Sequence, residues 1–404
     1  MYKPVKVVEV FLWGRRVGAI SHDYDAYSVF EYDPEFRKSG LEVAPFMMPL
    51  DRSVYHAEEF RLPQAMFSGL PGMIADSLPD SFGNMLVRRY MEDEGIDLRQ
   101  ITPLDRLAYV GSRGMGALTY RPALRDEDDV PSAIDMRSLV DEARLAMNHR
   151  LGSMPGAEAI REIIRVGTSA GGAQAKAVVG WNRETGQFIA GAGDLPEGSE
   201  HWLLKFSPLG LEDAGEKEYQ VYRQALAAGI VMSECRLVEV DGVRHFMTKR
   251  FDREKNRRIH MQTLCALQHV GHSSPRDAKR YELLFRTAVD LHLGYEALEQ
   301  LFRRMAFNVL IEEVDDHTKN FSFLMREDGK WELAPAYDLT GYHFSVGDKD
   351  FEGWANPHAL SVNGKTGNIG DDDLLAVAER YGIGTAKRAL REVKAALADA
   401  PNLV

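Results

Sequence analysis

The first residues of the chain alternate between apolar and polar positions, which is the period of a β-strand. An apolar run ends at Gly14, and the segments 17–20 and 27–32 follow it at hairpin spacing. Helical periodicity first appears between Phe82 and Glu94. The pattern therefore predicts a β-rich N-terminal part that passes into a helix.

The middle of the chain predicts a second set of strands, which follows a glycine-rich turn. We expect strands at 175–182, 188–190, 202–206, 235–240 and 244–249, and a helix at 216–228. Asp241-Gly242, between the last two strands, is a strong hairpin signal.

Helical periodicity dominates from Met261 onward. Apolar residues at 298, 301, 302, 305 and 309 share one helix face, and closing helices are expected at 372–381 and 385–397. A β-rich lobe followed by a helical lobe is the outline of a protein kinase.

The segment 121–131 is polar and holds two prolines, so it is the best linker candidate, and a helix is expected after it at 133–146. We therefore predict an α+β, protein-kinase-like, two-lobed fold. Its units would be an N-terminal β-rich subdomain (1–125), an N-lobe (126–260) and a helical C-lobe (261–404).

The composition narrows the class of protein. The chain has 404 residues and a net charge of −12, which argues against a broad nucleic-acid-binding surface. No window of 18 apolar residues and no signal peptide is apparent, so we expect a cytoplasmic protein. Cys235 and Cys265 lack ligand spacing and are expected to be buried. The densest basic run, 244–258, is interpreted as a solvated hairpin, although a local basic patch stays open.

The segment that begins at Val314 carries the clearest chemistry. Asp315 and Asn320 stand in a DxxxxN pattern, the spacing with which kinases aim a base and a metal ligand from one loop. A predicted hairpin follows, and Asp338 comes directly after it, where kinases place a second metal-binding aspartate. Mg²⁺ bound to ATP needs only these two oxygen ligands from the protein. Asp316 competes with Asp315 as the base but lacks the spacing to Asn320.

Two upstream features agree with this order. The turn at 167–176 (GTSAGGAQAK) suits backbone donation to phosphate, although it also fits a flexible hairpin turn. Lys205 is the single lysine of an apolar strand, and a buried lysine needs a partner. Glu218 is the natural partner, whereas a lysine turned to solvent is the alternative.

Other candidate motifs are interpreted as structural. The glycine-rich segment 111–116 (GSRGMG) has no capped helix after it, and His269 and His272 lack companions at zinc-ligand spacing. The sequence contains neither GxSxG nor HExxH.

Five ordered motifs resemble the HipA family of serine/threonine kinase toxins, which belong to bacterial toxin–antitoxin pairs. The motifs are GTSAGGAQAK (167–176), LLKF (203–206), KRFDR (249–253), DDHTKNFSF (315–323) and APAYDL (334–339). LPDSFGN, ending at Asn84, and LSVNGK (360–365) fit as well, so the resemblance spans almost the whole chain.

The resemblance implies a role for each site residue. Asp315 would be the catalytic base, Asn320 and Asp338 the magnesium ligands, and Lys205 the lysine on the ATP phosphates. Ser169 would be an autophosphorylation site that ejects the glycine-rich loop, with Thr168 as an adjacent alternative. The remaining nucleotide-site residues would be Ser169, Gly171, Gly172, Ala173, Gln174, Glu218, Phe251, His317, Lys319 and Tyr337.

The resemblance also implies partners and exposes departures. It implies a small helix-turn-helix antitoxin (HipB-like) that supplies the DNA contacts, and a target similar to an aminoacyl-tRNA synthetase. Lys249 stands where the best-known member has Glu, so the adenine contact would come from the backbone. Asp316 replaces a frequent Gly and would weaken ATP binding unless it points to solvent. A small-molecule or lipid kinase and a non-catalytic corepressor scaffold are the alternative functions.

Overall fold

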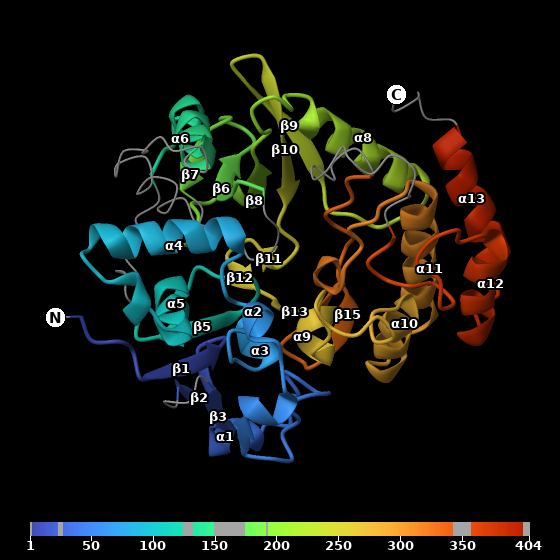
Figure 1. The fold of residues 1–404 in the computed structure, drawn as a ribbon. Helices are drawn as coiled ribbons and strands as arrows, with labels where there is room; N and C mark the ends of the chain where they lie inside the picture. Colours follow the sequence, from blue (N-terminus) through green and yellow to red (C-terminus); the bar gives the residue numbers. More distant parts are fainter. Residues whose placement is uncertain are drawn as a thin grey trace.

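The computed structural model describes residues 2–22, 27–123, 132–148, 174–190, 193–341 and 357–398. Figure 1 shows three parts: a sheet near the N-terminus, a second sheet above it and a group of helices beside both. The mixed α and β character confirms the predicted fold class.

The N-terminal sheet is antiparallel, with the strand order β4-β3-β2-β1-β5. Its strands are β1 (Val7–Leu12), β2 (Arg15–His22), β3 (Ser28–Tyr32), β4 (Val54–His56) and β5 (Leu118–Arg121). The short helices α1 (Pro34–Arg37), α2 (Gln64–Phe67) and α3 (Gly72–Ala75), with α5 (Pro103–Val110), surround it. Its apolar core reaches Cys265 and Met325, so this part shares a core with a segment much later in the chain.

The second sheet is also antiparallel and has the order β7-β6-β8-β10-β9. Its strands are β6 (Lys176–Asn182), β7 (Phe188–Ala190), β8 (Ser199–Lys205), β9 (Cys235–Val240) and β10 (Val243–Lys249). The helix α8 (Ala214–Ala227) packs against β9 and β10. The helices α4 (Ser81–Asp93) and α6 (Met136–Asn148) contribute to the same core, which joins the N-terminal part to this sheet.

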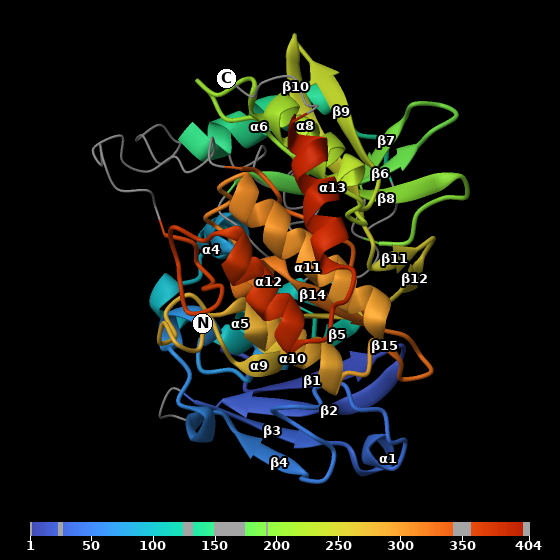
Figure 2. The same cartoon turned by 90° about the vertical axis from the view of Figure 1, so that its right-hand side faces the viewer.

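The C-terminal part is mainly helical and faces the viewer in Figure 2. Its helices are α9 (Leu264–Gln268), α10 (Tyr281–Asp290), α11 (Tyr295–Leu310), α12 (Asp371–Arg380) and α13 (Ala386–Ala398). A three-stranded sheet combines β13 (His260–Thr263) with the hairpin β14 (Ser322–Met325) and β15 (Trp331–Leu333). The helices share one apolar core, because the periodic face of α11 is buried against the others.

Most predicted elements are present within one to three residues of their expected ends. The exceptions concern the linker and the basic run. Most of the expected linker (124–131) lies outside the described residues. The solvated-hairpin interpretation of the run 244–258 is wrong for Arg250 and Arg253, which are buried. Each guanidinium is drawn inward by the fully buried carboxylate of Asp252.

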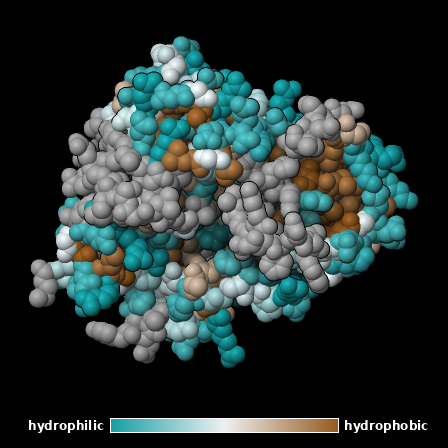
Figure 3. Space-filling view, turned by 45° about the horizontal axis from the view of Figure 1, so that its top comes forward, coloured by the Kyte–Doolittle hydropathy of each residue, from teal (hydrophilic) through white to brown (hydrophobic). Residues whose placement is uncertain are grey.

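Cys235 and Cys265 are both free and buried, as predicted. In the described ranges, no helix has the length and apolar character needed to cross a bilayer. Hydrophilic residues predominate on the face seen in Figure 3, where apolar residues gather in separate patches.

Candidate active site

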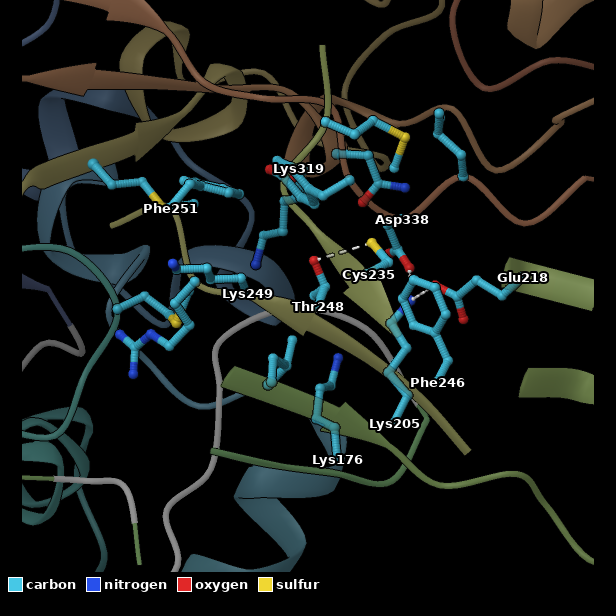
Figure 4. A pocket seen from close by; sticks show the side chains of 18 of the residues that line it. Lys176, Lys205, Glu218, Cys235, Phe246, Thr248, Lys249, Phe251, Lys319 and Asp338 are labelled. Atoms are coloured by element: carbon cyan, nitrogen blue, oxygen red, sulfur yellow. Dashed lines mark hydrogen bonds and ion pairs between the residues drawn. The ribbon is translucent and has the colours of Figure 1, made fainter. Parts of the chain in front are cut away.

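A cleft lies where the second sheet, the C-terminal part and the N-terminal part meet. It encloses about 1190 Å³ of empty space, its open mouth included. The sheet contributes Lys176 and Lys205, the C-terminal part contributes Asn320 and Asp338, and the N-terminal part contributes Asp76. Residues from three distant stretches of sequence therefore share one cavity (Figure 4).

Lys205 lies at the inner end of this cleft between two carboxylates. Its Nζ donates to Oε1 of Glu218 and to Oδ1 of Asp338, each at 2.5 Å. Glu218 comes from α8 and Asp338 from the segment after β15, so Lys205 joins the two lobes. The expected pair between Lys205 and Glu218 is present, and the solvent-facing alternative is wrong.

At Lys205 and Asp338, the attraction between opposite charges outweighs the cost of burying each charge. Burial opposes the positive charge of Lys205, but Asp338 and Glu218 more than offset it and raise its pKa. Burial likewise opposes ionisation of Asp338, yet Lys205 and Lys176 hold its pKa well below the ordinary value. Burial raises the pKa of Glu218 against the attraction of Lys205. Lys205 and Asp338 are thus both charged at neutral pH, as phosphate and metal binding require.

The backbone at Asp338 is in the left-handed region, with φ of +56°. Asp tolerates this conformation better than most non-glycine residues, but it still carries a cost. The conformation is maintained because the side chain is fixed on Lys205 and the following residues are held by Glu313. Strain of this kind is often found at functional sites.

The loop after α11 brings Asp315 and Asn320 together. The amide nitrogen of Asn320 donates to the carbonyl oxygen of Asp315 at 3.0 Å, which leaves the amide oxygen for another partner. His317 lies with Nε2 3.8 Å from Oδ1 of Asp315. A 3-10 turn, Thr318–Asn320, closes the loop before β14. The DxxxxN spacing therefore corresponds to one compact loop.

The carboxylate of Asp315 is open to solvent, because its side chain is 76% exposed. Its pKa is raised, first by the loss of hydration beside the protein, with His317 opposing the rise and Asp338 adding to it. Solvent around most of the side chain keeps the carboxylate ionised at neutral pH.

Two buried carboxylates, those of Glu313 and Asp316, lie on either side of Asp315 and hold the loop. The sequence did not reveal this role. Glu313 accepts hydrogen bonds from the backbone N–H of Asp315, Thr340 and Gly341. It thereby ties the loop to the residues that follow Asp338. The cluster of acids around Asp315 was a weak signal for it, because neighbouring acids can differ in burial.

Asp316 faces away from the cleft and is 1% exposed. It accepts hydrogen bonds from the Tyr281 hydroxyl at 2.7 Å and from the backbone N–H of Ala359 at 2.8 Å, and it pairs with Nδ1 of His358 at 3.1 Å. The expectation that Asp316 points either toward ATP or toward solvent is therefore wrong. These donors turn the carboxylate inward, where it holds the loop.

An aromatic and polar wall forms the outer end of the cleft. The rings of Phe251 and Tyr337 lie 5.5 Å apart between centroids, and the Tyr337 hydroxyl donates to the carbonyl oxygen of Lys319. Phe251, Lys319 and Tyr337 all line the cavity, as expected for nucleotide-site residues. Lys249 also lines the cavity, and its ammonium group donates to Glu200 at 2.6 Å.

The glycine-rich turn is described only from its end. Ser169, Gly171, Gly172 and Ala173 lie outside the described residues, as does Thr168. Gln174 is described, and its amide donates to the carbonyl oxygen of Phe206 at 3.0 Å. Gln174 thus contacts the residue that follows β8, next to Lys205.

The N-terminal part contributes two acids that sequence reasoning missed. Asp76 lines the cleft and accepts the backbone N–H and the hydroxyl of Thr263 at 2.8 and 2.9 Å. Asp80 forms an ion pair with Lys176 at 3.1 Å. The LPDSFGN segment held a signal for Asp80, because an acid before Ser81 is typical of a helix N-cap.

The segments set aside as structural do connect parts of the fold. In the glycine-rich segment 111–116, the carbonyl oxygens of Gly114 and Gly116 accept hydrogen bonds from Arg253. His269 accepts the backbone N–H of Gly72 at 2.9 Å. Both contacts bind the N-terminal part to the rest of the chain.

Comparison with known proteins decides the family. The model of the HipA N-terminal domain matches residues 8–121, and that of the HipA-like C-terminal domain matches residues 168–401. This chain belongs to the HipA family. Together the two matches cover both sheets and the C-terminal helices.

Individual relatives of this HipA-family chain are distant. It is 23% identical over 347 residues to "Putative kinase Y4dM" of Sinorhizobium fredii, covering 83% of this chain and 77% of that protein. It is 26% identical over 154 residues to a "Putative kinase" of Haemophilus influenzae, covering 34% and 44%.

A solved structure shows the same fold. It is HipA from Shewanella oneidensis, determined as a toxin–antitoxin complex of HipA, HipB and operator DNA. The identity is 20%, the TM-score is 0.65, and the match covers 98% of this chain and 92% of that one. The predicted kinase-like, two-lobed fold is thereby confirmed.

Proposed function

We propose that this chain is an ATP- and Mg²⁺-dependent serine/threonine-protein kinase and the toxin of a toxin–antitoxin pair. The observation that carries the proposal is Lys205 bound between Glu218 and Asp338, in one cleft with Asn320. Phosphoryl transfer depends on positioning and on charge neutralisation, and these groups supply both.

The acidic and amide groups of the site fit Mg²⁺. Asn320 keeps its amide oxygen available because its amide nitrogen is used by Asp315, and Asp338 uses one oxygen on Lys205. Hard oxygen ligands of this kind suit Mg²⁺, which completes its shell with phosphate and water. When bound there, the ion would neutralise charge on the transferred phosphoryl group.

The backbone at the end of β10 and just after it (249–251) is suited to binding an adenine base. The backbone N–H of Lys249 donates to Glu234, and that of Arg250 donates to His201. The N–H of Phe251 has no acceptor among the residues that the structure describes. It is therefore available to a ring nitrogen of the base, while the Phe251 side chain lines the cavity. This backbone contact would replace the side-chain contact that Lys249 cannot make.

The exposure of Asp315 favours a protein substrate. An open carboxylate can meet the hydroxyl of a serine on a protein surface, orient it and accept its proton. We propose a target of the aminoacyl-tRNA synthetase class, on the family resemblance. Ser169 is proposed as the autophosphorylation site, where a phosphate would repel the nucleotide.

The partner is proposed from the family and from charge. The Shewanella oneidensis HipA structure contains HipB and operator DNA. With a net charge of −12, this chain would contact DNA through a HipB-like, helix-turn-helix antitoxin.

The test uses the purified full chain with γ-labelled ATP and Mg²⁺ in a bacterial lysate. The proposal expects one or a few labelled protein bands, and no label with Asp315→Asn. Label confined to small molecules would instead identify a small-molecule kinase. A chain that transfers no label, and whose Asp315→Ala variant keeps every cellular phenotype, would be a scaffold.

Two further measurements address regulation and partnership. Mass spectrometry of the chain after incubation with ATP should find phosphate on Ser169, and a Ser169→Ala variant should lose that peak. If a small helix-turn-helix protein is encoded beside this chain, co-expression of the two should yield a stable complex.

A further inference from the structure

Two lysines face the cleft from neighbouring strands. Lys176 of β6 and Lys205 of β8 are directly opposite in the antiparallel register. Opposite residues of such a pair project from the same face of the sheet. Both side chains line the cavity, and Figure 4 shows both reaching into it.

Each of these lysines has a carboxylate partner from a different part of the chain. Lys205 binds Glu218 from α8 of its own lobe. Lys176 binds Oδ2 of Asp80 at 3.1 Å, and both side chains are almost completely buried, at 6% and 3% exposure. Asp80 lies within residues 8–121, the part that matches the HipA N-terminal domain.

The position of Asp80 does not depend on Lys176. Its Oδ1 accepts the backbone N–H of Gly83 at 2.6 Å and so caps α4. Phe82 and Leu86 of that helix lie in the same apolar core as Ala177 and Leu204 of β6 and β8. Among the residues that the structure describes, Oδ2 of Asp80 has no polar partner other than Lys176. The carboxylate is therefore a fixed point against which the longer lysine side chain is oriented.

A buried ammonium group is costly unless it is paired, so the paired rotamer is strongly preferred. Lys176 also lies in the same cavity as Asp338. The pair thus orders a positive charge beside the proposed metal ligand.

We propose that Asp80 is a positioning residue that holds the Lys176 ammonium group toward the polyphosphate of the bound nucleotide. The N-terminal part thereby supplies the carboxylate of a second lysine–carboxylate pair, beside the pair of Lys205 and Glu218. The inference rests on the proposed function, since it assumes that the cleft binds ATP.

The test compares the binding of a non-hydrolysable ATP analogue with Mg²⁺ and the binding of adenosine, both by calorimetry on the full chain. Asp80→Asn keeps a good N-cap for α4 but removes the charge. We expect affinity for the ATP analogue to fall about tenfold with adenosine affinity unchanged. The unfolding temperature should also fall, because Lys176 loses its buried partner. A tenfold fall is what a charge-assisted contact of ordinary strength contributes.

Three further variants make the result specific. Lys176→Met should weaken analogue binding to a similar degree, and the double variant should bind no more weakly than Lys176→Met alone. Asp33→Asn is the matched control, because Asp33 also caps a helix of the N-terminal part but lies outside the cleft. It should bind both compounds as the wild type does. Should Asp80→Asn fail to fold, Asp80→Ser provides another uncharged cap.

Several results would overturn the inference. Unchanged analogue affinity in Asp80→Asn would do so, and so would an equal loss of adenosine binding, which indicates a general structural defect. Additive losses in the double variant would also separate Asp80 from Lys176. Wild-type chain that binds neither compound would overturn the proposed function and this inference with it.

Discussion

The carboxylate of Asp252 accepts the backbone N–H of Gly116 at 2.7 Å, in a fully buried position. Gly116 has φ of +70°, and a Cβ there would come within 3.1 Å of the Met261 backbone nitrogen. Asp252 also binds Arg250 and Arg253. One carboxylate thus connects the N-terminal part to the segment that borders the cleft.

We predict that Asp252→Asn is strongly destabilising. Removal of the charge leaves Arg250 and Arg253 buried beside each other without their shared counter-ion. The loss of one partner of a buried pair costs about 3–5 kcal/mol of unfolding free energy. Urea denaturation measures the loss. Asp328→Asn, in the exposed turn between β14 and β15, is the control and should stay within about 0.5 kcal/mol of the wild type.

Asp315→Asn should abolish phosphotransfer while the nucleotide still binds. The amide cannot accept the substrate proton, and loss of a general base lowers kcat by about 100- to 10,000-fold. Labelled-ATP assays measure the rate, and calorimetry measures nucleotide binding. Asp372→Asn, at the exposed start of α12, should keep full activity. Activity retained in Asp315→Asn would assign the base to another residue.

Lys205→Met should destabilise the chain in a way that Mg²⁺ partly reverses. The substitution leaves Glu218 and Asp338 as buried carboxylates without their shared cation, at a cost of about 3–5 kcal/mol. Magnesium bound at Asp338 would replace part of the lost charge. Denaturation with and without Mg²⁺ tests this prediction. Lys217→Met is the control, because it removes a more exposed ion pair, with Asp213, at the start of α8, the helix that carries Glu218. It should cost less than about 1 kcal/mol. Equal destabilisation with and without Mg²⁺ would argue against metal binding at Asp338.

The pair of His358 and Asp316 should make stability depend on pH. Burial opposes protonation of His358, but Asp316 outweighs it and raises the pKa above the ordinary value of 6.5. The folded state therefore holds the proton more tightly than the unfolded state. The stabilisation that this pair contributes is complete below pH 6.5, and it is lost as the pH rises through the folded-state pKa of His358.

His358→Gln isolates this effect. The difference in unfolding temperature between wild type and variant should be largest below pH 6.5 and should shrink toward alkaline pH. His292→Gln serves as a control, because His292 lies at the exposed end of α10. A difference that stays constant with pH would show that the pair does not titrate in this range.

Local chemistry made part of the site predictable. A lone lysine in an apolar strand requires a counter-charge, and this requirement led from Lys205 to Glu218. The spacing of Asp315 and Asn320 corresponds to a single loop, so it was readable without the fold. The contact of Lys205 with Asp338 spans 133 residues and has no local signal.

Other residues were misread because burial is decided by packing. Arg250 and Arg253 lie in a basic stretch that is typical of a solvated surface. They are nevertheless enclosed by Asp252 and by the segment 111–116. Asp316 follows Asp315 directly, but the two carboxylates have opposite environments. Asp315 is exposed, whereas Asp316 is fully enclosed.

The sequence by itself determined the order of strands and helices, the acidic balance and the DxxxxN loop, because each depends on neighbouring residues. Only the tertiary structure decided that Asp76 of the N-terminal part lines the cleft, that Asp80 pairs with Lys176, and that Asp316 turns inward. Pairing between distant groups depends on how the sheets and helices pack, and no local pattern encodes it.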